Sequence, residues 1–316
     1  MPLEQLKEYM GVSPKADDFD AFWDDAVATI PEHGADYILE KSEFQVAGVT
    51  CYHLYFRAED GSRVHALFSR PEKIEGASPA IIKFHGYSGA SGGFHEIITY
   101  SLLGYTVLYL DCRGQGGISE DLAQTKGSTY FGLIIRGLEE GPHKLYFKKV
   151  FLDTVRCARI LLNMEGVSHC VGVVGGSQGG ALALACAALE PRIKFALVSA
   201  PFLCDFKRII DLGLMQNAYQ EFGWHFRIRD PRHERQDEFL NVLSYIDVVN
   251  LAPRIRAEVF WKIGLMDVTC PPSTQFAAYN QLKSAKTMRI YPEYEHDIVG
   301  RYSDEELEFI IMHCKG

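Results

Sequence analysis

Ser177 lies in the sequence pattern that most strongly suggests a chemical reaction. It is the centre of Gly175-Gly-Ser177-Gln-Gly179, directly after an apolar run at residues 171–174 and directly before an Ala- and Leu-rich stretch at 178–189. A G-x-S-x-G motif between a strand and a helix forms a nucleophile elbow, whose sharp turn exposes the serine hydroxyl. The positive end of the helix dipole also favours the developing negative charge there. We therefore interpret Ser177 as a nucleophile and not as the N-cap of an ordinary glycine-rich turn.

A serine hydroxyl needs a base to take its proton, and a carboxylate usually orients that base. In proteins with this elbow the chain order is Ser, acid, His. His296 follows the last predicted strand, in a loop, and is our predicted base. His225 and His233 come before any late strand that could supply the acid, and His313 lies inside a predicted terminal helix.

The acid should follow the penultimate strand, and Asp267 lies at that place. Its alternative role is an Asx turn or a helix start, because Pro271 and the next residue begin a helical stretch. Asp247 is the second candidate. Glu293 and Glu295 are too close in sequence to the histidine to serve naturally as its acid.

Acyl transfer also requires hydrogen-bond donors for the oxyanion. The backbone N–H of Gln178, the residue after the serine, is the first predicted donor. The second is expected from the loop after an early strand, and residues 85–89, His-Gly-Tyr-Ser-Gly, follow the apolar run 80–84. Tyr87 is the predicted donor in this loop, through its N–H. We assign His85 a role in shaping the turn.

Nucleotide and metal sites find little support. A phosphate loop needs Gly-Lys followed by Ser or Thr, and the glycine-rich turn at 175–180 contains no lysine. Residues 111–119 miss the dinucleotide fingerprint, because Ser119 occupies the third glycine position. No H-x-x-x-H or Cys/His ligand spacing is found. We predict neither cofactor nor metal.

The arrangement of apolar segments predicts the fold class. Early alternating stretches at 43–49, 51–57 and 64–69 favour antiparallel strands. Later short apolar runs alternate with helical segments, which indicates an α/β fold with a mostly parallel sheet covered by helices on both faces. The predicted strands are 80–84, 106–110, 171–174, 195–198, 258–263 and 288–290, and the predicted helices are 146–164, 178–189, 273–283 and 304–313.

No linker or repeat divides the chain, so residues 1–316 are predicted to form one domain. Its first 35 residues are expected to be a helical lead-in, because Phe19, Phe22, Trp23 and Val27 recur at helical spacing. Residues 203–249 contain no convincing strand. We interpret them as a helical insertion over the carboxyl edge of the sheet, either a cap or an oligomer contact.

Composition limits the possible partners. The 316 residues are 47% hydrophobic and carry a formal net charge of −9, without a basic block. This argues against binding of nucleic acid or anionic membrane. No apolar run approaches the length of a membrane helix, and residues 1–10 do not resemble a signal peptide, so a cytoplasmic location is expected. The eight cysteines lack C-x-x-C spacing and are interpreted as buried free thiols.

These motifs together resemble the acetyl xylan esterase and cephalosporin C deacetylase family, carbohydrate esterase family 7. The resemblance rests on Ser177 within Gly-Gly-Ser-Gln-Gly-Gly, on Arg113-Gly-Gln115 after a strand, and on His296 followed by an acid. The loop 85–89 and the stretch 264–267 match as well, and the resemblance extends over essentially the whole chain. One departure lies beside the histidine, where Asp297 replaces the usual glutamate.

The resemblance implies an α/β-hydrolase that removes acetyl groups from small acetylated sugars and from cephalosporin C. It implies a triad of Ser177, Asp267 and His296, and oxyanion donors at Tyr87 and Gln178. It further implies that Arg113 and Gln115 support the site and that protomers assemble as hexamers. The alternatives are a serine peptidase or acyltransferase of the same fold, or an inactive hydrolase-fold binding protein.

Overall fold

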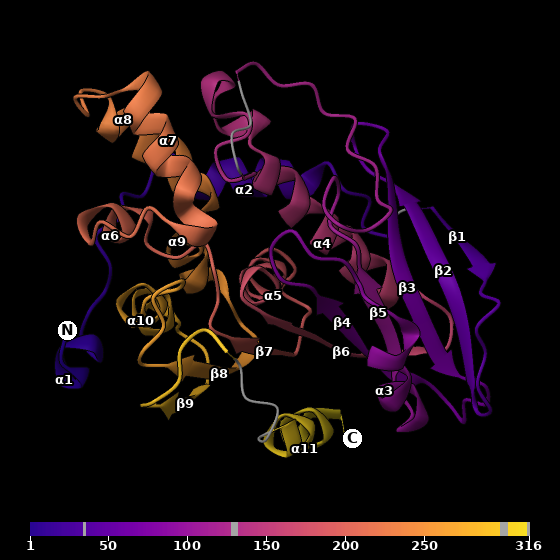
Figure 1. Cartoon of the computed structure of the whole chain (residues 1–316). Coiled ribbons are helices and arrows are strands. Elements are labelled where there is room, and N and C mark those ends of the chain that lie inside the picture. The colour runs from indigo at the N-terminus through magenta and orange to yellow at the C-terminus, as the bar shows by residue number, and fades with distance from the viewer. Residues whose placement is uncertain (34–35, 128–131, 298–302, 315–316) are drawn as a thin grey trace.

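A nine-stranded sheet forms the centre of the protein (Figure 1). The computed structural model describes residues 1–33, 36–127, 132–297 and 303–314. The strand order is β1-β2-β3-β5-β4-β6-β7-β8-β9. The strands are β1 (Tyr37–Lys41), β2 (Val49–Arg57), β3 (Arg63–Pro71), β4 (Ser78–Phe84), β5 (Thr106–Leu110), β6 (Val167–Gly176), β7 (Phe195–Ser199), β8 (Glu258–Gly264) and β9 (Lys286–Tyr291).

The sheet is antiparallel at one side and parallel over the rest. β1, β2, β3 and β5 pair in antiparallel fashion, whereas β5, β4, β6, β7, β8 and β9 are parallel neighbours. The carboxyl ends of the parallel strands therefore meet at one edge, where sites form in such sheets. The predicted α/β class with a mostly parallel sheet is confirmed.

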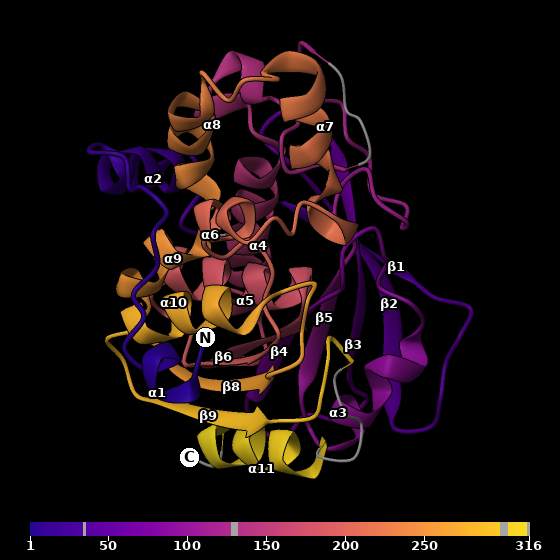
Figure 2. The same cartoon turned by 60° about the vertical axis from the view of Figure 1, so that its left-hand side comes forward.

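Helices cover both faces of the sheet, as the two views show (Figures 1 and 2). The larger core contains residues of α2, α4, α5, α9 and α10. The smaller core, on the other face, contains residues of α11 together with Phe94 and Ile97, which precede α3. The helices are α1 (Leu3–Leu6), α2 (Phe19–Ala28), α3 (Ile98–Leu102), α4 (Tyr146–Leu162), α5 (Gln178–Leu189), α6 (Phe206–Asp211), α7 (Gln220–Arg229), α8 (Gln236–Leu243), α9 (Val248–Leu251), α10 (Pro272–Gln281) and α11 (Ser303–Cys314).

The lead-in is helical only in part. α2 buries Phe19, Phe22 and Trp23 at the predicted spacing, and the indole N–H of Trp23 donates to the carbonyl of Tyr245 at 2.9 Å. This contact joins the lead-in to the segment between β7 and β8. α1 is a short helix, and the rest of the described lead-in is irregular or turn-like.

The prediction of a strand at residues 43–49 is wrong, because the edge strand is β1, at Tyr37–Lys41. The side-chain amide of Gln45 explains the difference. It accepts from the Cys51 N–H at 3.1 Å and donates to the Cys51 carbonyl at 2.8 Å, so a side chain replaces a neighbouring strand there. β1 itself is mostly exposed and therefore lacks a clear alternation of apolar residues.

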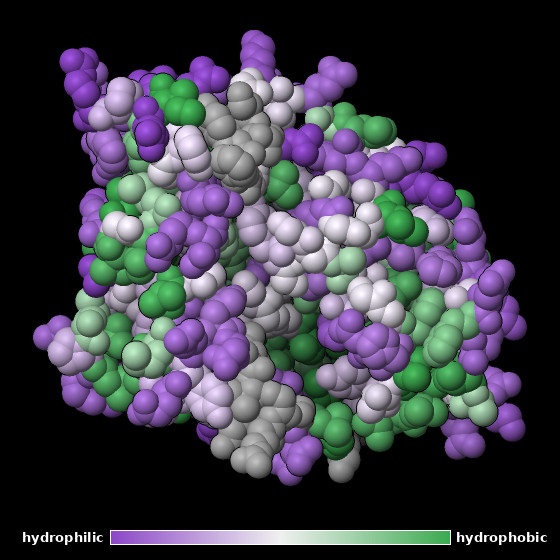
Figure 3. All heavy atoms as spheres, viewed as in Figure 1, coloured by the Kyte–Doolittle hydropathy of each residue, from purple (hydrophilic) through white to green (hydrophobic). Residues whose placement is uncertain are grey.

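Residues 203–249, all of which the structure describes, form helices and turns without a strand. They include α6, α7 and α8, which lie together beyond one end of the sheet (Figure 2). No helix of the described ranges is long and apolar enough to cross a membrane. All eight cysteines are free thiols, six of them buried. In Figure 3, hydrophilic residues dominate the rim of the visible face, and apolar residues surface in smaller groups.

Candidate active site

The turn at Ser177 is held in a strained conformation. β6 ends at Gly176 and α5 begins at Gln178, and between them Ser177 has φ 54° and ψ −121°. A residue with a side chain adopts this conformation only where surrounding contacts enforce it. Here the Ser177 N–H donates to the Ser199 carbonyl at 2.9 Å, and its own carbonyl accepts from Phe202 at 3.0 Å. These bonds fix the turn against β7 and the residues after it.

Two glycines of the motif allow backbone to approach backbone. A Cβ at Gly175 would overlap the carbonyl of Gly179 within the turn. A Cβ at Gly179 would overlap the carbonyl of Phe84, the last residue of β4. The elbow therefore lies directly against the start of the loop 85–89, which contains the predicted oxyanion donor.

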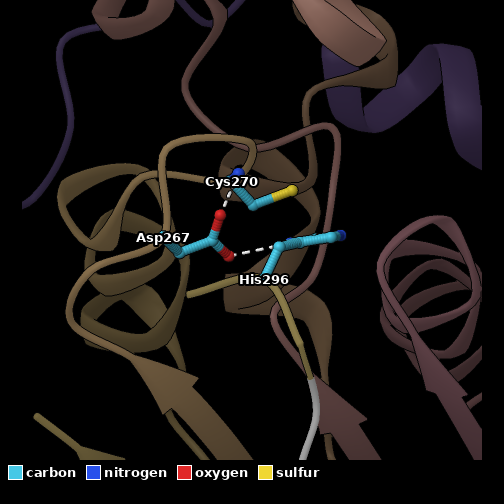
Figure 4. Close-up of side chains that lie close together, drawn as sticks. All are labelled: Asp267, Cys270 and His296. Carbon is cyan, nitrogen blue, oxygen red and sulfur yellow. Dashed lines mark hydrogen bonds and ion pairs between the residues drawn. The ribbon is translucent and has the colours of Figure 1, made fainter. Parts of the chain in front are cut away.

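His296 connects Ser177 to Asp267. Its Nε2 lies 3.0 Å from the Ser177 Oγ, and its Nδ1 lies 2.8 Å from the Asp267 Oδ2. The Asp267 Oδ1 accepts from the N–H groups of Thr269 and Cys270, each at 2.8 Å. Figure 4 shows the resulting direction of the carboxylate toward the imidazole. The structure thus brings together the three residues predicted as nucleophile, base and acid.

The hydrogen bonds of His296 define its tautomer. A carboxylate accepts only, so Nδ1 carries the proton that bonds Asp267, and Nε2 is left to accept from the Ser177 hydroxyl. The Asp267 side chain is fully buried, whereas that of His296 is 30% exposed. A substrate can therefore reach the histidine, while water has no access to the carboxylate behind it.

The histidine loop reaches Asp267 only because β8 ends in Gly264. A Cβ at this position would overlap the carbonyls of Tyr294 and Glu295. The loop is held there by the Met266 N–H, which donates to the Tyr294 carbonyl at 2.9 Å. Gly264 begins the stretch 264–267 that matches the family, but its role in this approach depends on a contact between residues distant in sequence.

The predicted oxyanion donors lie on adjoining segments. In the described chain, the N–H groups of Tyr87 and Gln178 donate to no protein acceptor. The Gln178 side chain joins the two segments, since its amide donates to the His85 carbonyl at 3.3 Å. Gln115 binds both: it donates to the Gln178 Oε1 at 2.7 Å and accepts from the Ser88 N–H at 2.9 Å. Gln115 therefore supports the frame and leaves both donor N–H groups free.

Arg113 fixes the loop that contains Gln115. Its guanidinium binds Asp153 through two bonds of 2.7 Å and Asp60 through one of 2.9 Å. Burial opposes the charged form of Arg113, but these carboxylates outweigh it and raise the arginine pKa above its ordinary value. The Arg113 carbonyl accepts from the Tyr146 hydroxyl. Arg113 is thus a structural residue beneath the site.

His85 and Asp111 connect the loop after β4 to the residues after β5. The His85 Nε2 accepts from the Cys112 N–H at 3.0 Å and its Nδ1 bonds the Gly86 carbonyl at 2.8 Å, an arrangement that fits the predicted role in shaping the turn. Asp111 accepts from the Ser91 N–H at 2.6 Å. Burial alone would raise the Asp111 pKa, but hydrogen bonds from the His65 imidazole and from Ser91 lower it to about 2.

Glu221 is a buried carboxylate beside the site that sequence reasoning missed. It comes from α7 and accepts from the N–H groups of Ile134 and Ile135 at 3.0 and 3.1 Å. It also accepts from the Tyr87 hydroxyl at 3.3 Å. Burial raises the Glu221 pKa to about 7, despite these donors. The segment 203–249 thereby contacts the side chain of a predicted oxyanion residue.

The other candidates are not brought to the serine. Asp247 is buried at the start of α9 and accepts from the N–H groups of Asp205 and Phe206. His225 packs against a phenylalanine of α8, His233 bonds Gln236, and His313 bonds Glu258. Asp297 accepts from the Glu295 N–H at 3.1 Å within its own loop.

The comparisons agree with this geometry. The sequence model of the acetyl xylan esterase family matches residues 1–313. This chain belongs to the acetyl xylan esterase family. The family places it among the carboxylic ester hydrolases, and the expected resemblance and the α/β-hydrolase fold are confirmed.

Two solved structures of family members superpose over nearly the whole chain. Acetyl xylan esterase 1 from Thermoanaerobacterium sp. JW/SL YS485 is 46% identical, with a TM-score of 0.97, covering 100% of this chain and 99% of that one. The acetyl xylan esterase from Paenibacillus sp. R4 is 35% identical, with a TM-score of 0.93 and 99% coverage of both chains.

A curated relative is longer. Acetyl esterase Axe7A from Xylanibacter ruminicola is 27% identical over 308 residues, which are 93% of this chain. The match covers 65% of the length of that relative.

A metal ion fits the esterase-family site poorly. Asp267, Cys270 and His296 have potential ligand atoms within 4.8 Å of one another (Figure 4). Both imidazole nitrogens are already engaged, by Asp267 and by Ser177. Burial raises the Cys270 thiol pKa well above its ordinary value, so it stays protonated, and the thiolate is the form that binds metal. The cluster is better explained as part of the hydrogen-bonded triad.

The Gly264→Ala variant should lower kcat by about 100-fold, because the added methyl displaces the histidine loop and small misplacements of a base have effects of that size. Ester hydrolysis and the circular dichroism spectrum should be compared with those of Gly223→Ala. The second glycine lies in α7, where a Cβ would make only ordinary contacts. Full activity in Gly264→Ala would contradict the role of this close approach.

Glu221 should make stability depend on pH near neutrality. Its pKa in the fold, about 7, exceeds the ordinary 4.5, so its contribution is present below about pH 4.5 and is lost as pH rises through 7. The melting temperature of Glu221→Gln should therefore fall less between pH 5 and 8 than that of the parent. Asp247, whose pKa burial also raises to about 7, remains in both proteins. The exposed Glu8→Gln is the control, and an unchanged slope in Glu221→Gln would refute the assignment.

Proposed function

We propose that this chain is a serine carboxylesterase that removes acetyl groups from acetylated xylo-oligosaccharides and from cephalosporin C. The observation that carries the proposal is the continuous set of hydrogen bonds from Ser177 through His296 to Asp267, next to two free backbone N–H groups. Membership of the acetyl xylan esterase family indicates that the acyl group is acetyl. The protein names of its relatives favour acetylated xylan as the substrate class.

The reaction would proceed in two acyl-transfer steps. The Ser177 Oγ attacks the acetyl carbonyl while His296 takes the serine proton. The N–H groups of Gln178 and Tyr87 stabilise the oxyanion. The sugar alcohol leaves with the proton from His296, and water then repeats the sequence on the acetyl-enzyme. Asp267 holds the imidazole tautomer and stabilises the imidazolium. No step requires a metal or cofactor.

Two further properties are proposed from the family resemblance. Protomers would assemble as hexamers, and the protein would work in the cytoplasm. Eight free thiols fit a reducing compartment. The chain would form one hydrolase domain with a lead-in at 1–35 and an insertion at 203–249. The contact of Glu221 with Tyr87 favours a cap role for the insertion.

Replacing the nucleophile tests the mechanism. Ser177→Ala should reduce turnover of p-nitrophenyl acetate by roughly 10⁴–10⁶-fold, since a triad without its nucleophile retains only binding and oxyanion stabilisation. Ser284→Ala is a matched control, because the Ser284 hydroxyl is buried and has no hydrogen-bond partner among the described residues. Retained activity in Ser177→Ala would reject the assignment. An inactive parent protein would favour the binding-protein alternative.

A substrate panel tests the specificity. Rates should fall from acetyl through propionyl and butyryl to octanoyl esters, with both sugar and aryl leaving groups, and cephalosporin C should be deacetylated. Faster cleavage of peptide anilides than of acetyl esters would favour the peptidase alternative. Preferential transfer of acetyl to an added alcohol over water would favour the acyltransferase.

A further inference from the structure

A cavity of about 390 Å³ opens beside the start of α4, outside the proposed reaction site. Its volume is within the range of small-molecule sites. Five cationic side chains and three carboxylates line it. This leaves two positive charges in excess, in a chain whose formal net charge is −9. The charge of the cavity is thus opposite to that of the protein as a whole.

The carboxylates of the cavity are largely committed to Arg113. Asp153 binds the Arg113 guanidinium through two bonds, and Asp60 binds it through a third. Lys149 shares Asp60, at 3.5 Å. Asp153 and Asp60 together carry one negative charge more than Arg113, so with Glu59 two negative charges are left against the four other cations of the cavity.

Arg156 lines the cavity with an unpaired guanidinium. Its residue is only 6% exposed, yet in the described chain it makes no hydrogen bond or ion pair. Burial lowers the Arg156 pKa, although the nearby charges of Asp153, Glu59 and Asp60 oppose that shift. A buried charge is costly unless a counter-charge pairs with it directly. No carboxylate of the described residues lies close enough to form that pair.

The amino-terminal end of α4 adds positive charge where a helix least tolerates it. Lys148 and Lys149 lie in its first turn and Lys144 just precedes it, whereas the first turn contains no acidic residue and Leu145 provides no cap. Cations at this end oppose the helix dipole. Burial, together with Lys149 and Lys144, lowers the Lys148 pKa, and Glu59 offsets this only in part.

We propose that this cavity binds a small phosphate-bearing ligand, with Arg156 and Lys148 as its principal contacts. A guanidinium fork binds phosphate oxygens in a bidentate manner, and lysines add point charges. A dianion would balance the two excess charges and would complement the helix dipole. The volume leaves room for an organic group as well as the phosphate. Inorganic phosphate and a small phosphorylated organic molecule share this chemistry.

Calorimetric titration in chloride buffer at fixed ionic strength tests the site. Inorganic phosphate, pyrophosphate and glucose 6-phosphate are the probes, and glucuronate is the carboxylate counterpart. At least one phosphate probe should bind with one-to-one saturation, and Arg156→Gln should weaken it at least about tenfold. Arg232→Gln, an exposed arginine paired with Glu234, should bind as the parent does. Stronger binding of inorganic phosphate than of glucose 6-phosphate would identify the free ion as the ligand.

Three results would overturn the proposal: no saturable binding of any phosphate probe, tighter binding of glucuronate, or equal weakening in Arg232→Gln. If Arg156→Gln fails to fold, Lys148→Gln provides the test, with an expected loss of severalfold in affinity. Thermal unfolding separates a ligand site from a structural pair. Arg156→Met without ligand should melt no lower than the parent, because it removes an unpaired charge and keeps the apolar stem. A markedly lower melting temperature would assign Arg156 to structure.

Discussion

The close backbone contact between the Ser177 turn and the end of β4 is the constraint on which the site depends. Gly179 lies against the Phe84 carbonyl, so the nucleophile turn and the loop 85–89 share one boundary. Backbone donors from both segments can then face the same reacting carbonyl. A side chain at this contact would separate the segments. The strain at Ser177 is tolerated because bonds to Ser199 and Phe202 hold the turn from the other side.

Buried carboxylates connect the loops that this contact leaves adjacent. Asp111 binds the N–H of Ser91, Asp153 holds Arg113, and Glu221 joins the 203–249 segment to Tyr87. Such groups are expensive to bury unless their acceptors are filled. These carboxylates accept hydrogen bonds chiefly from backbone N–H groups or from arginine. The bonds hold the irregular loops in place although the loops have no secondary structure of their own.

The chemistry was predictable because it follows strand ends. Ser177, Asp267 and His296 each come after a strand of the parallel sheet, and such ends meet at one edge. The strands β4 to β8 were predictable for a different reason, because strands buried on both faces appear as continuous apolar runs. The exposed edge strand β1 has no such run, and the prediction of a strand at residues 43–49 is wrong for that reason.

The sequence by itself determined the class of fold, the nucleophile turn and the order of the three candidate groups, because each depends on residues adjacent in the chain. Tertiary structure decided which partners complete the site. Gly264 matters through its approach to Tyr294, Gln115 through Gln178, and Glu221 through Tyr87. The same is true of Arg156, which lines a cavity without forming a hydrogen bond or ion pair to any of the described residues. Contacts between residues distant in sequence leave no periodic pattern in the chain, so they become known only from the folded structure.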